Sequence, residues 1–138
     1  MCMAVSEYCL AIMALAFQAR RILFVEDNDE IRRTIVTFLS DYQFTEAATV
    51  AEGWNHFKAR KFSLVLLDVG LSDGSGLHLC KRMRSVDGAT PINVLSSNHS
   101  LTQEEIEEVG AQIIIKKGCP NFISSLKSSI ERFSVADA

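Results

Sequence analysis

Polar and charged side chains stand directly after several short apolar runs in this chain of 138 residues. Glu26 and Asp27 follow the first of these runs, and Asp68 follows a later one. If the runs are parallel strands, their carboxyl ends meet at one edge of a sheet, where open α/β sheets bind ligands. Carboxylates gathered there would repel one another, and a bound divalent cation would relieve that repulsion. Oxygen ligands of this kind suit Mg²⁺, which keeps several waters and leaves room for phosphate oxygens.

The other polar residues at this expected edge suit the transfer of a phosphoryl group. A carboxylate on an accessible strand end, here Asp68, can attack a phosphoryl donor and form an acyl phosphate. The metal and a lysine, Lys116 or Lys117, would neutralise the oxygens of the transferred group, and a hydroxyl at the end of the next run, Ser96 or Ser97, would hydrogen-bond to them. Each residue alone has a simpler explanation, because strand-end acids often cap helices and lysines are usually solvated. Their placement after successive apolar runs favours one shared site.

The alternation of apolar runs with amphipathic segments predicts the elements that would position these residues. Five runs have the continuous apolar character of buried parallel strands. These runs are Ile22–Val25, Phe44–Ala47, Leu64–Leu67, Ile92–Leu95 and Ile113–Ile115. The sequence therefore predicts an α/β fold built from five β/α units.

Apolar residues at helical spacing predict a helix after each strand. The first helix is expected to take Asn28 or Asp29 as its N-cap. The later helices are expected over Val50–Arg60, over Leu77–Arg84, from Thr102, and over Phe122–Phe133 with Pro120 near the first turn of the last one. The glycine-rich stretch from Gly70 to Gly76 lacks the Lys-Ser/Thr end of a phosphate-binding loop, and it is interpreted as a flexible loop.

The composition indicates one soluble domain with no affinity for nucleic acid of its own. Hydrophobic residues make up 48% of the chain and charged residues 22%, and the formal net charge is −3. The Lys and Arg residues are scattered along the sequence, so direct nucleic-acid binding is not expected. The four cysteines lack metal-ligand spacing, which fits a reduced cytoplasmic protein.

Residues 20–134 are expected to form a single domain, preceded by an apolar extension over residues 1–19 and followed by a short tail over residues 135–138. The apolar run Tyr8–Phe17 is about half as long as a membrane-spanning helix requires, so no membrane span is expected. It also lacks the positive start of a signal peptide. The extension is interpreted as the product of an upstream start codon, or as a helix that packs on the domain or on a second copy.

Several motifs together resemble those of response-regulator receiver domains of two-component signalling, in a stand-alone, single-domain form. The resemblance covers about Arg21 to Phe133. It implies a flavodoxin-like, doubly wound (βα)5 fold with a five-stranded parallel sheet of order 2-1-3-4-5. The motifs are Ile22–Asn28, Leu64–Asp68, Asp73–Gly76, Pro91–Ser97, and Gly110–Ala111 followed by Lys117.

The resemblance also implies roles for the metal-binding residues. Asp68 is the phosphoacceptor and one of the ligands of Mg²⁺. Asp27 is a direct ligand of the metal, Glu26 is a ligand through water, and the backbone carbonyl of Gly70 is the third protein ligand. The family uses Mg²⁺ as its cofactor, and no other cofactor is implied.

The resemblance also implies roles for the residues that bind the phosphoryl group and for those that respond to it. Ser96 is implied as the switch hydroxyl and Lys117 as the lysine that contacts the phosphoryl group. Gly70 and Asn98 occupy the variable positions that tune how fast the phosphoryl group is lost. Ile114 stands where receivers usually place an aromatic switch residue. An isoleucine cannot swing a ring between buried and exposed states, so the sequence departs from the family at this position.

The resemblance implies a signalling role rather than that of an enzyme. The expected donor is a sensor histidine kinase or a histidine phosphotransfer protein, and the expected output is a protein target bound in trans, with a homodimer as a further possibility. The alternative is a degenerate receiver that acts as a phosphorylation-independent interaction module. A haloacid-dehalogenase-like phosphatase is excluded, because it needs a second Asp two residues after the first and Gly70 stands there.

Overall fold

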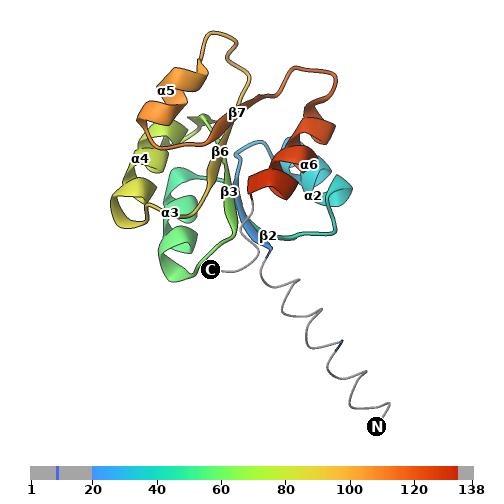
Figure 1. The fold of residues 1–138 in the computed structure, drawn as a ribbon, viewed down its shortest axis with the longest axis horizontal. Coiled ribbons are helices and arrows are strands. Elements are labelled where there is room, and N and C mark those ends of the chain that lie inside the picture. The colour runs from blue at the N-terminus through green and yellow to red at the C-terminus, as the bar shows by residue number, and fades with distance from the viewer. Residues whose placement is uncertain (1–8, 10–19, 134–138) are drawn as a thin grey trace.

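A five-stranded parallel sheet forms the centre of the protein (Figure 1). The computed structural model describes residue 9 and residues 20–133. The strands are β1 Arg21–Val25, β2 Gln43–Ala47, β3 Leu64–Asp68, β6 Ile92–Ser96 and β7 Ile113–Lys116, and they lie in the order β2-β1-β3-β6-β7. Counted along the sheet, this is the order 2-1-3-4-5, so the expected flavodoxin-like (βα)5 fold is confirmed.

Five helices cover the two faces of this sheet. They are α2 Asp29–Phe38, α3 Val50–Ala59, α4 Gly76–Val86, α5 Gln103–Glu108 and α6 Phe122–Phe133. Helices α2 and α6 pack on one face, and α3, α4 and α5 pack side by side on the other (Figure 1). Each face therefore has its own apolar core. The helix residues buried in the two cores include Ile35, Leu126 and Ile130 on the first face, and Phe57, Leu79, Met83 and Ile106 on the second.

The position of each strand in the sheet explains how clearly the sequence signals it. Every residue of β3 and β6 is buried, because these strands have neighbours on both sides and helices on both faces. Only Ala47 is buried in β2, which lies at the edge of the sheet. An edge strand needs fewer apolar residues, and the Phe44–Ala47 run is accordingly the least apolar of the five predicted strands.

Polar side chains fix the starts of the helices. The Asn28 side chain accepts a hydrogen bond from the Ile31 N–H at 3.0 Å, so Asn28 rather than Asp29 is the N-cap of α2. Thr102 caps α5 in the expected way, through the Glu105 N–H. Pro120 was expected near the first turn of the last helix, but α6 begins at Phe122 and the proline precedes it.

The stretch from Gly70 to Gly76 was expected to be a flexible loop, and this expectation was wrong. It forms a small antiparallel hairpin of β4 Gly70–Leu71 and β5 Gly74–Ser75, and Gly76 begins α4. Between the two strands, the Asp73 carboxylate accepts hydrogen bonds from the Val50 and Ala51 N–H groups at the start of α3, at 2.7 and 3.3 Å. The hairpin is thus tied to a helix that lies 22 residues or more away in sequence.

Three expectations concern the ends of the chain and the membrane. The apolar extension over residues 1–19 lies outside the described residues except for residue 9, and the tail over residues 135–138 lies outside them as well. The domain limits at residues 20 and 134 stay predictions. Among the described residues, the helices are too short or too polar to cross a membrane.

Candidate functional site

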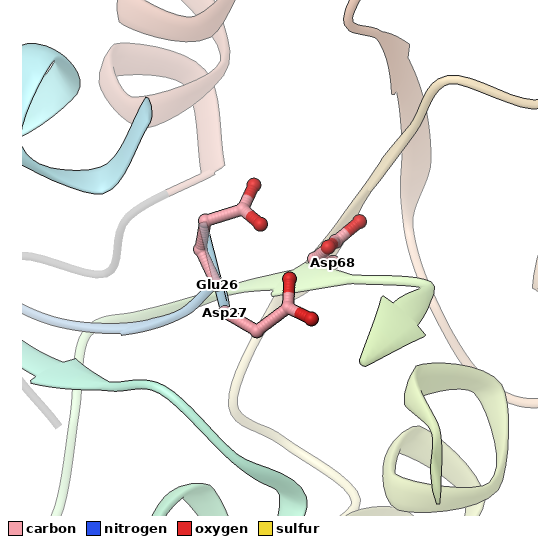
Figure 2. A group of neighbouring side chains, drawn as sticks. All are labelled: Glu26, Asp27 and Asp68. Carbon is pink, nitrogen blue, oxygen red and sulfur yellow. The ribbon is translucent and has the colours of Figure 1, made fainter. Parts of the chain in front are cut away.

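Three carboxylates lie together at the carboxyl end of the sheet. In the parallel register of β1 and β3, Val25 lies opposite Leu67, so the next residues, Glu26 and Asp68, are neighbours. A carboxylate oxygen from each of Glu26, Asp27 and Asp68 lies within 4.8 Å of the others, and Figure 2 shows the side chains gathered where the two strands end. Glu26 and Asp68 are buried, and Asp27 is half-buried. The structure thus brings together the acids that the sequence pattern had placed at one edge.

Lys117 reaches the same cluster from the end of β7. Its Nζ atom lies 2.5 Å from Oε1 of Glu26 and 3.0 Å from Oδ1 of Asp68. The lysine side chain is only 14% exposed, so water screens these ion pairs weakly. Its backbone N–H also bonds to the Ser96 carbonyl at 2.9 Å, which continues the pairing of β7 with β6. One ammonium group therefore offsets part of the negative charge of the cluster.

Burial and the close charges shift the pKa values within the cluster. Burial of Glu26, together with the neighbouring Asp68, raises its pKa from 4.5 to about 7, although the Lys117 ammonium acts in the opposite direction. Burial alone would lower the pKa of Lys117, but the hydrogen bond to Glu26 and the charge of Asp68 raise it instead. The lysine is therefore held in its charged form. A positive charge is thus fixed beside Asp68.

Backbone groups shape the surroundings of Asp68. The Gly70 N–H points at Oδ1 of Asp68 at 3.4 Å, and a Cβ atom added to Gly70 would have no atom within 4 Å. At Gly76, by contrast, an added Cβ atom would lie 2.0 Å from the Asp68 carbonyl oxygen. Only glycine permits this approach of α4 to the end of β3. The start of the helix therefore fixes the backbone that carries the Asp68 side chain.

Ser96 and Asn98 lie in the loop that follows β6. Ser96 is buried at the strand end, and its Oγ atom accepts the Asn98 N–H at 2.9 Å. The Asn98 side chain is exposed, and its oxygen accepts the Ser100 N–H and hydroxyl at 3.0 and 2.7 Å. Ser96 thus lies at the same edge of the sheet as the acids, and Asn98 stabilises the loop through its own hydrogen bonds.

Ile114 lies in β7 and packs against the core under α3, α4 and α5. Its N–H donates to the side-chain oxygen of Gln103 at 3.1 Å, and the Gln103 amide nitrogen donates to the Gln112 carbonyl at 2.7 Å. Lys116 in turn donates to the Asn98 and Leu101 carbonyls of the β6–α5 loop, at 2.8 and 2.6 Å. Ile114 is thus an aliphatic side chain in a region where side chains of Gln103 and Lys116 bond to backbone groups.

Sequence reasoning missed Arg32, which holds the acid-bearing loop in place. Its guanidinium donates to the Glu26 carbonyl at 2.6 Å, to the Asp29 side chain at 2.6 Å and to the Glu46 side chain at 3.0 Å. The spacing of three residues between Asp29 and Arg32 is typical of a helical ion pair and was the one available signal. The contacts to Glu26 and Glu46 depend on the folded chain. Arg32 therefore joins the loop after β1 to α2 and β2.

The donor set of the cluster fits a small, hard divalent cation. All three side chains offer carboxylate oxygens, which Mg²⁺ prefers over nitrogen and sulfur ligands. Two of them are buried with a single ammonium group between them, so the cluster keeps an excess of negative charge. A divalent cation would remove that excess.

The sequence matches known families and proteins over most of the described chain. The family model of the response regulator receiver domain matches residues 22–127. The uncharacterized transcriptional regulatory protein YkoG of Bacillus subtilis is 33% identical over 99 residues, which cover 70% of this chain and 43% of that protein. The KDP operon transcriptional regulatory protein KdpE of Escherichia coli is 32% identical over 105 residues, 75% of this chain and 43% of that protein. The chain spans less than half the length of these relatives.

Solved structures of low sequence identity share the fold. A CheY-like response regulator receiver domain protein from Methanospirillum hungatei has a TM-score of 0.72 at 24% identity, and the match covers 82% of this chain and 94% of that one. The response regulator TrrA of Thermotoga maritima, solved in complex with Mg²⁺-BeF, has a TM-score of 0.74 at 22% identity. This match covers 83% of this chain and 98% of that one. These likenesses support the fold of the chain.

Proposed function

The chain belongs to the family of response regulator receiver domains, and we propose that its Asp68 accepts a phosphoryl group in a two-component phosphorelay. The donor is a phosphohistidine of a sensor histidine kinase or of a histidine phosphotransfer protein. The phosphorylated domain then signals in the cytoplasm to a protein target in trans. The observation that carries this proposal is the Asp68 carboxylate, which is buried beside two acids with its Oδ1 atom 3.0 Å from a lysine ammonium.

The transfer exchanges one bond to phosphorus for another. A carboxylate oxygen of Asp68 attacks the phosphorus atom of the phosphohistidine, so a P–O bond forms as the P–N bond breaks. The histidine nitrogen leaves with the electron pair of the broken bond. With a proton on the other ring nitrogen of the histidine, the products are an aspartyl phosphate on this chain and a neutral imidazole on the donor.

The acid cluster would hold Mg²⁺ during this step. Asp27 and Asp68 would supply direct carboxylate ligands, Glu26 would bind through a water, and the Gly70 carbonyl would supply the remaining protein ligand. When bound, Mg²⁺ neutralises the oxygens of the phosphoryl group and the repulsion among the acids. The fit of three close carboxylate oxygens to a hard cation supports this assignment.

Lys117 and Ser96 would bind the phosphoryl group once it is on Asp68. The Lys117 ammonium already lies beside the Asp68 carboxylate, so it is placed to neutralise a negative oxygen there. Ser96 accepts the Asn98 N–H, and its own hydroxyl proton makes no hydrogen bond to another described residue. That proton can be donated to a phosphoryl oxygen, and the movement would carry the β6–α5 loop with it.

Two positions would set the lifetime of the phosphoryl group. Gly70 is exposed and has no side chain to shield Asp68 from water. Asn98 is also exposed, but its side-chain oxygen is held by Ser100. Neither residue covers the acyl phosphate with apolar atoms.

A second candidate function is a receiver that binds its partner without phosphorylation. Ile114 favours it, because an aliphatic residue replaces the ring whose reorientation reports the phosphorylated state in the family. Direct nucleic-acid binding is part of neither proposal. The two functions differ in whether the protein takes up a phosphoryl group at all.

Intact-mass measurement after incubation with Mg²⁺ and acetyl phosphate separates these functions. We expect the wild type to gain the mass of one phosphoryl group, and to lose this gain with EDTA or with Asp68→Asn. Asp41→Asn is a matched control, since Asp41 is an exposed carboxylate outside the site, and this variant should be modified like the wild type. A wild type that stays unmodified while its circular dichroism shows a folded protein would reject phosphorylation and leave the interaction module.

A further inference from the structure

A groove between α3 and α4 gathers positive charge that is dispersed in the sequence. It has a volume of about 670 Å³, and Lys81 and Arg82 of α4 line it opposite Val50 of α3. A second hollow beside it is lined by Lys58, Arg60 and Lys61, by the ring of Trp54, and by Asp87, whose carboxylate lies 3.6 Å from the Lys61 ammonium. We call these two hollows together the basic groove. Five of the 14 Lys and Arg residues, which look scattered along the chain, are thus assembled on one surface by the pairing of two helices.

Trp54 lies at the centre of the basic groove with a cation on either side. The Arg82 guanidinium lies 4.1 Å and the Lys58 ammonium 5.5 Å from the centre of the indole ring. Within the described part of the chain, Lys58, Lys81 and Arg82 form no salt bridge. Trp and Arg are the residues that most often dominate the energy of protein interfaces. The groove therefore offers an aromatic anchor and uncompensated positive charges to an acidic partner.

Helix α5 carries the opposite charge at high density. Glu104, Glu105, Glu107 and Glu108 are all exposed, and they occupy four of the six positions of the helix. Glu104 and Glu108 are four residues apart, a spacing at which like charges destabilise a helix. Glu107 and Glu108 also lie at the carboxyl end, where the helix dipole disfavours negative charge and no basic residue is present. A basic surface placed against α5 would offset these repulsions.

The basic groove and the acidic helix lie on the same face of the molecule. Helices α3, α4 and α5 all pack on the core that contains Phe57, Met83 and Ile106, and Figure 1 shows them in a row. A face that is positive at one end and negative at the other is complementary to itself under a twofold rotation. Each copy would then contribute both charges, and the two contacts would form together.

We propose that this face binds a second copy of the chain, with α5 of each copy lying on the basic groove of the other. The association uses the charges of α3, α4 and α5, so it does not depend on the phosphorylation of Asp68. Nucleic acid is a poorer occupant, because the Glu residues of α5 lie on the same face and would repel its phosphates. An unrelated acidic protein would neutralise the positive charge of the groove, but it would leave the negative charge of α5 without a basic partner.

The test uses charge reversal on each half of the surface. One variant, Lys58→Glu with Arg82→Glu, reverses two of the five cations of the basic groove. The other, Glu104→Lys with Glu108→Lys, reverses two of the four carboxylates of α5. Analytical ultracentrifugation at low salt should show a dimer for the wild type and a dissociation constant at least about tenfold higher for each variant alone. An equimolar mixture of the two variants should associate more tightly than either variant alone, because the unaltered α5 of one variant can then lie on the unaltered groove of the other. Lys127→Glu, an exposed change on α6 of the opposite face, should dimerise like the wild type.

Trp54 provides a second readout, since it is the only tryptophan of the chain. Its emission should shift to shorter wavelength as the wild type or the mixture is concentrated, and salt should reverse the shift. A wild type that remains monomeric at low salt overturns the proposal, even if its groove then binds an acidic peptide such as polyglutamate. Variants that dimerise alone as well as the wild type, or a mixture that stays monomeric, overturn it too.

Discussion

The acid cluster at the end of the sheet and the α5–β7 side of the molecule follow the receiver pattern to different degrees. In the cluster, the expected residue types are present and in contact: Lys117 bridges Glu26 and Asp68. On the α5–β7 side, β7 carries Ile114 at the position that we expect to correspond to the aromatic switch, and the Gln103 and Lys116 side chains connect strand, loop and helix through hydrogen bonds to backbone groups.

This difference indicates that phosphoryl transfer and the transmission of the signal to α5 place different demands on the residue types. Phosphoryl transfer needs particular atoms at particular places, so its residues can be identified one by one. Transmission needs only contacts that change when the β6–α5 loop moves, and different side chains can supply them. We expect Lys116 and Gln103 to carry the movement of this loop to α5 where an aromatic residue would otherwise do so.

The largest effect on the chemistry is expected from Lys117→Ala. Loss of a preorganised positive charge beside the reacting group should slow phosphorylation by acetyl phosphate about 100-fold. The measurement is the initial rate of mass gain at saturating Mg²⁺, with the exposed Lys127→Ala as control. A rate within twofold of the wild type would show that Lys117 has no role in binding the phosphoryl group.

Asp87, in the turn after α4, provides a test remote from both regions. Burial raises the pKa of its carboxyl, but hydrogen bonds from Thr90 and the Ala89 N–H outweigh this and lower the pKa from 3.8 to about 2. The carboxylate therefore contributes about 2 kcal/mol of stability above the unfolded pKa, and this contribution is lost as the pH falls toward 2.

Asp87→Asn should accordingly lower the free energy of unfolding by about 2 kcal/mol at pH 7. The difference from the wild type should shrink between pH 4 and pH 2, as followed by urea denaturation. Phosphorylation at neutral pH should be unchanged, because the folded protein keeps both regions intact. A difference that is independent of pH would assign the effect to packing rather than to the charge.

Asn93 lies in β6 between the two regions, and its replacement should stabilise the protein. Its side chain is fully buried, and its amide nitrogen and oxygen have no hydrogen-bond partner among the described residues. In the sheet it is flanked by Leu66 and Ile113. Asn93→Leu should raise the free energy of unfolding by about 1 to 2 kcal/mol, because no desolvated polar group remains. A loss of stability would show that the Asn93 amide has a partner in solution.

Gln103→Ala is expected to have the smallest effect on stability. It should have a clear effect on how the signal passes from the phosphoryl site to α5. This change removes the hydrogen bond from the Ile114 N–H of β7 and the one to the Gln112 carbonyl just before that strand, and it should lower the stability by about 1 kcal/mol. The phosphorylation rate should stay within twofold of the wild type, while NMR shift changes in α5 on activation should shrink. Unaltered shifts in α5 would show that the signal reaches it by another route.

The sequence predicted the parts of the fold that depend on local patterns. Continuous apolar runs revealed the central strands β3 and β6, and the residues that follow the strands located the acid cluster. Because parallel strands end at one edge, no knowledge of side-chain contacts was needed to bring Glu26 and Asp68 together.

The parts that the sequence did not predict depend on contacts between distant segments. The hairpin after β3 is held by the bonds from Asp73 to the start of α3, and Arg32 is explained by its contacts to Glu26 and Glu46. The basic groove exists only because α3 and α4 lie side by side. Such features need the packed structure, since no local spacing encodes which segments meet.

The most direct test of the account is the amide NMR spectrum of the folded protein with Mg²⁺ and beryllofluoride, a mimic of the phosphoryl group. We expect shifts that depend on Asp68 and that begin at Ser96 and Lys117 and extend through the β6–α5 loop to Ile114 and α5. This result would establish a receiver that switches without an aromatic residue in β7. A spectrum that is unchanged from that of the protein with Mg²⁺ alone would contradict the proposed phosphoryl site.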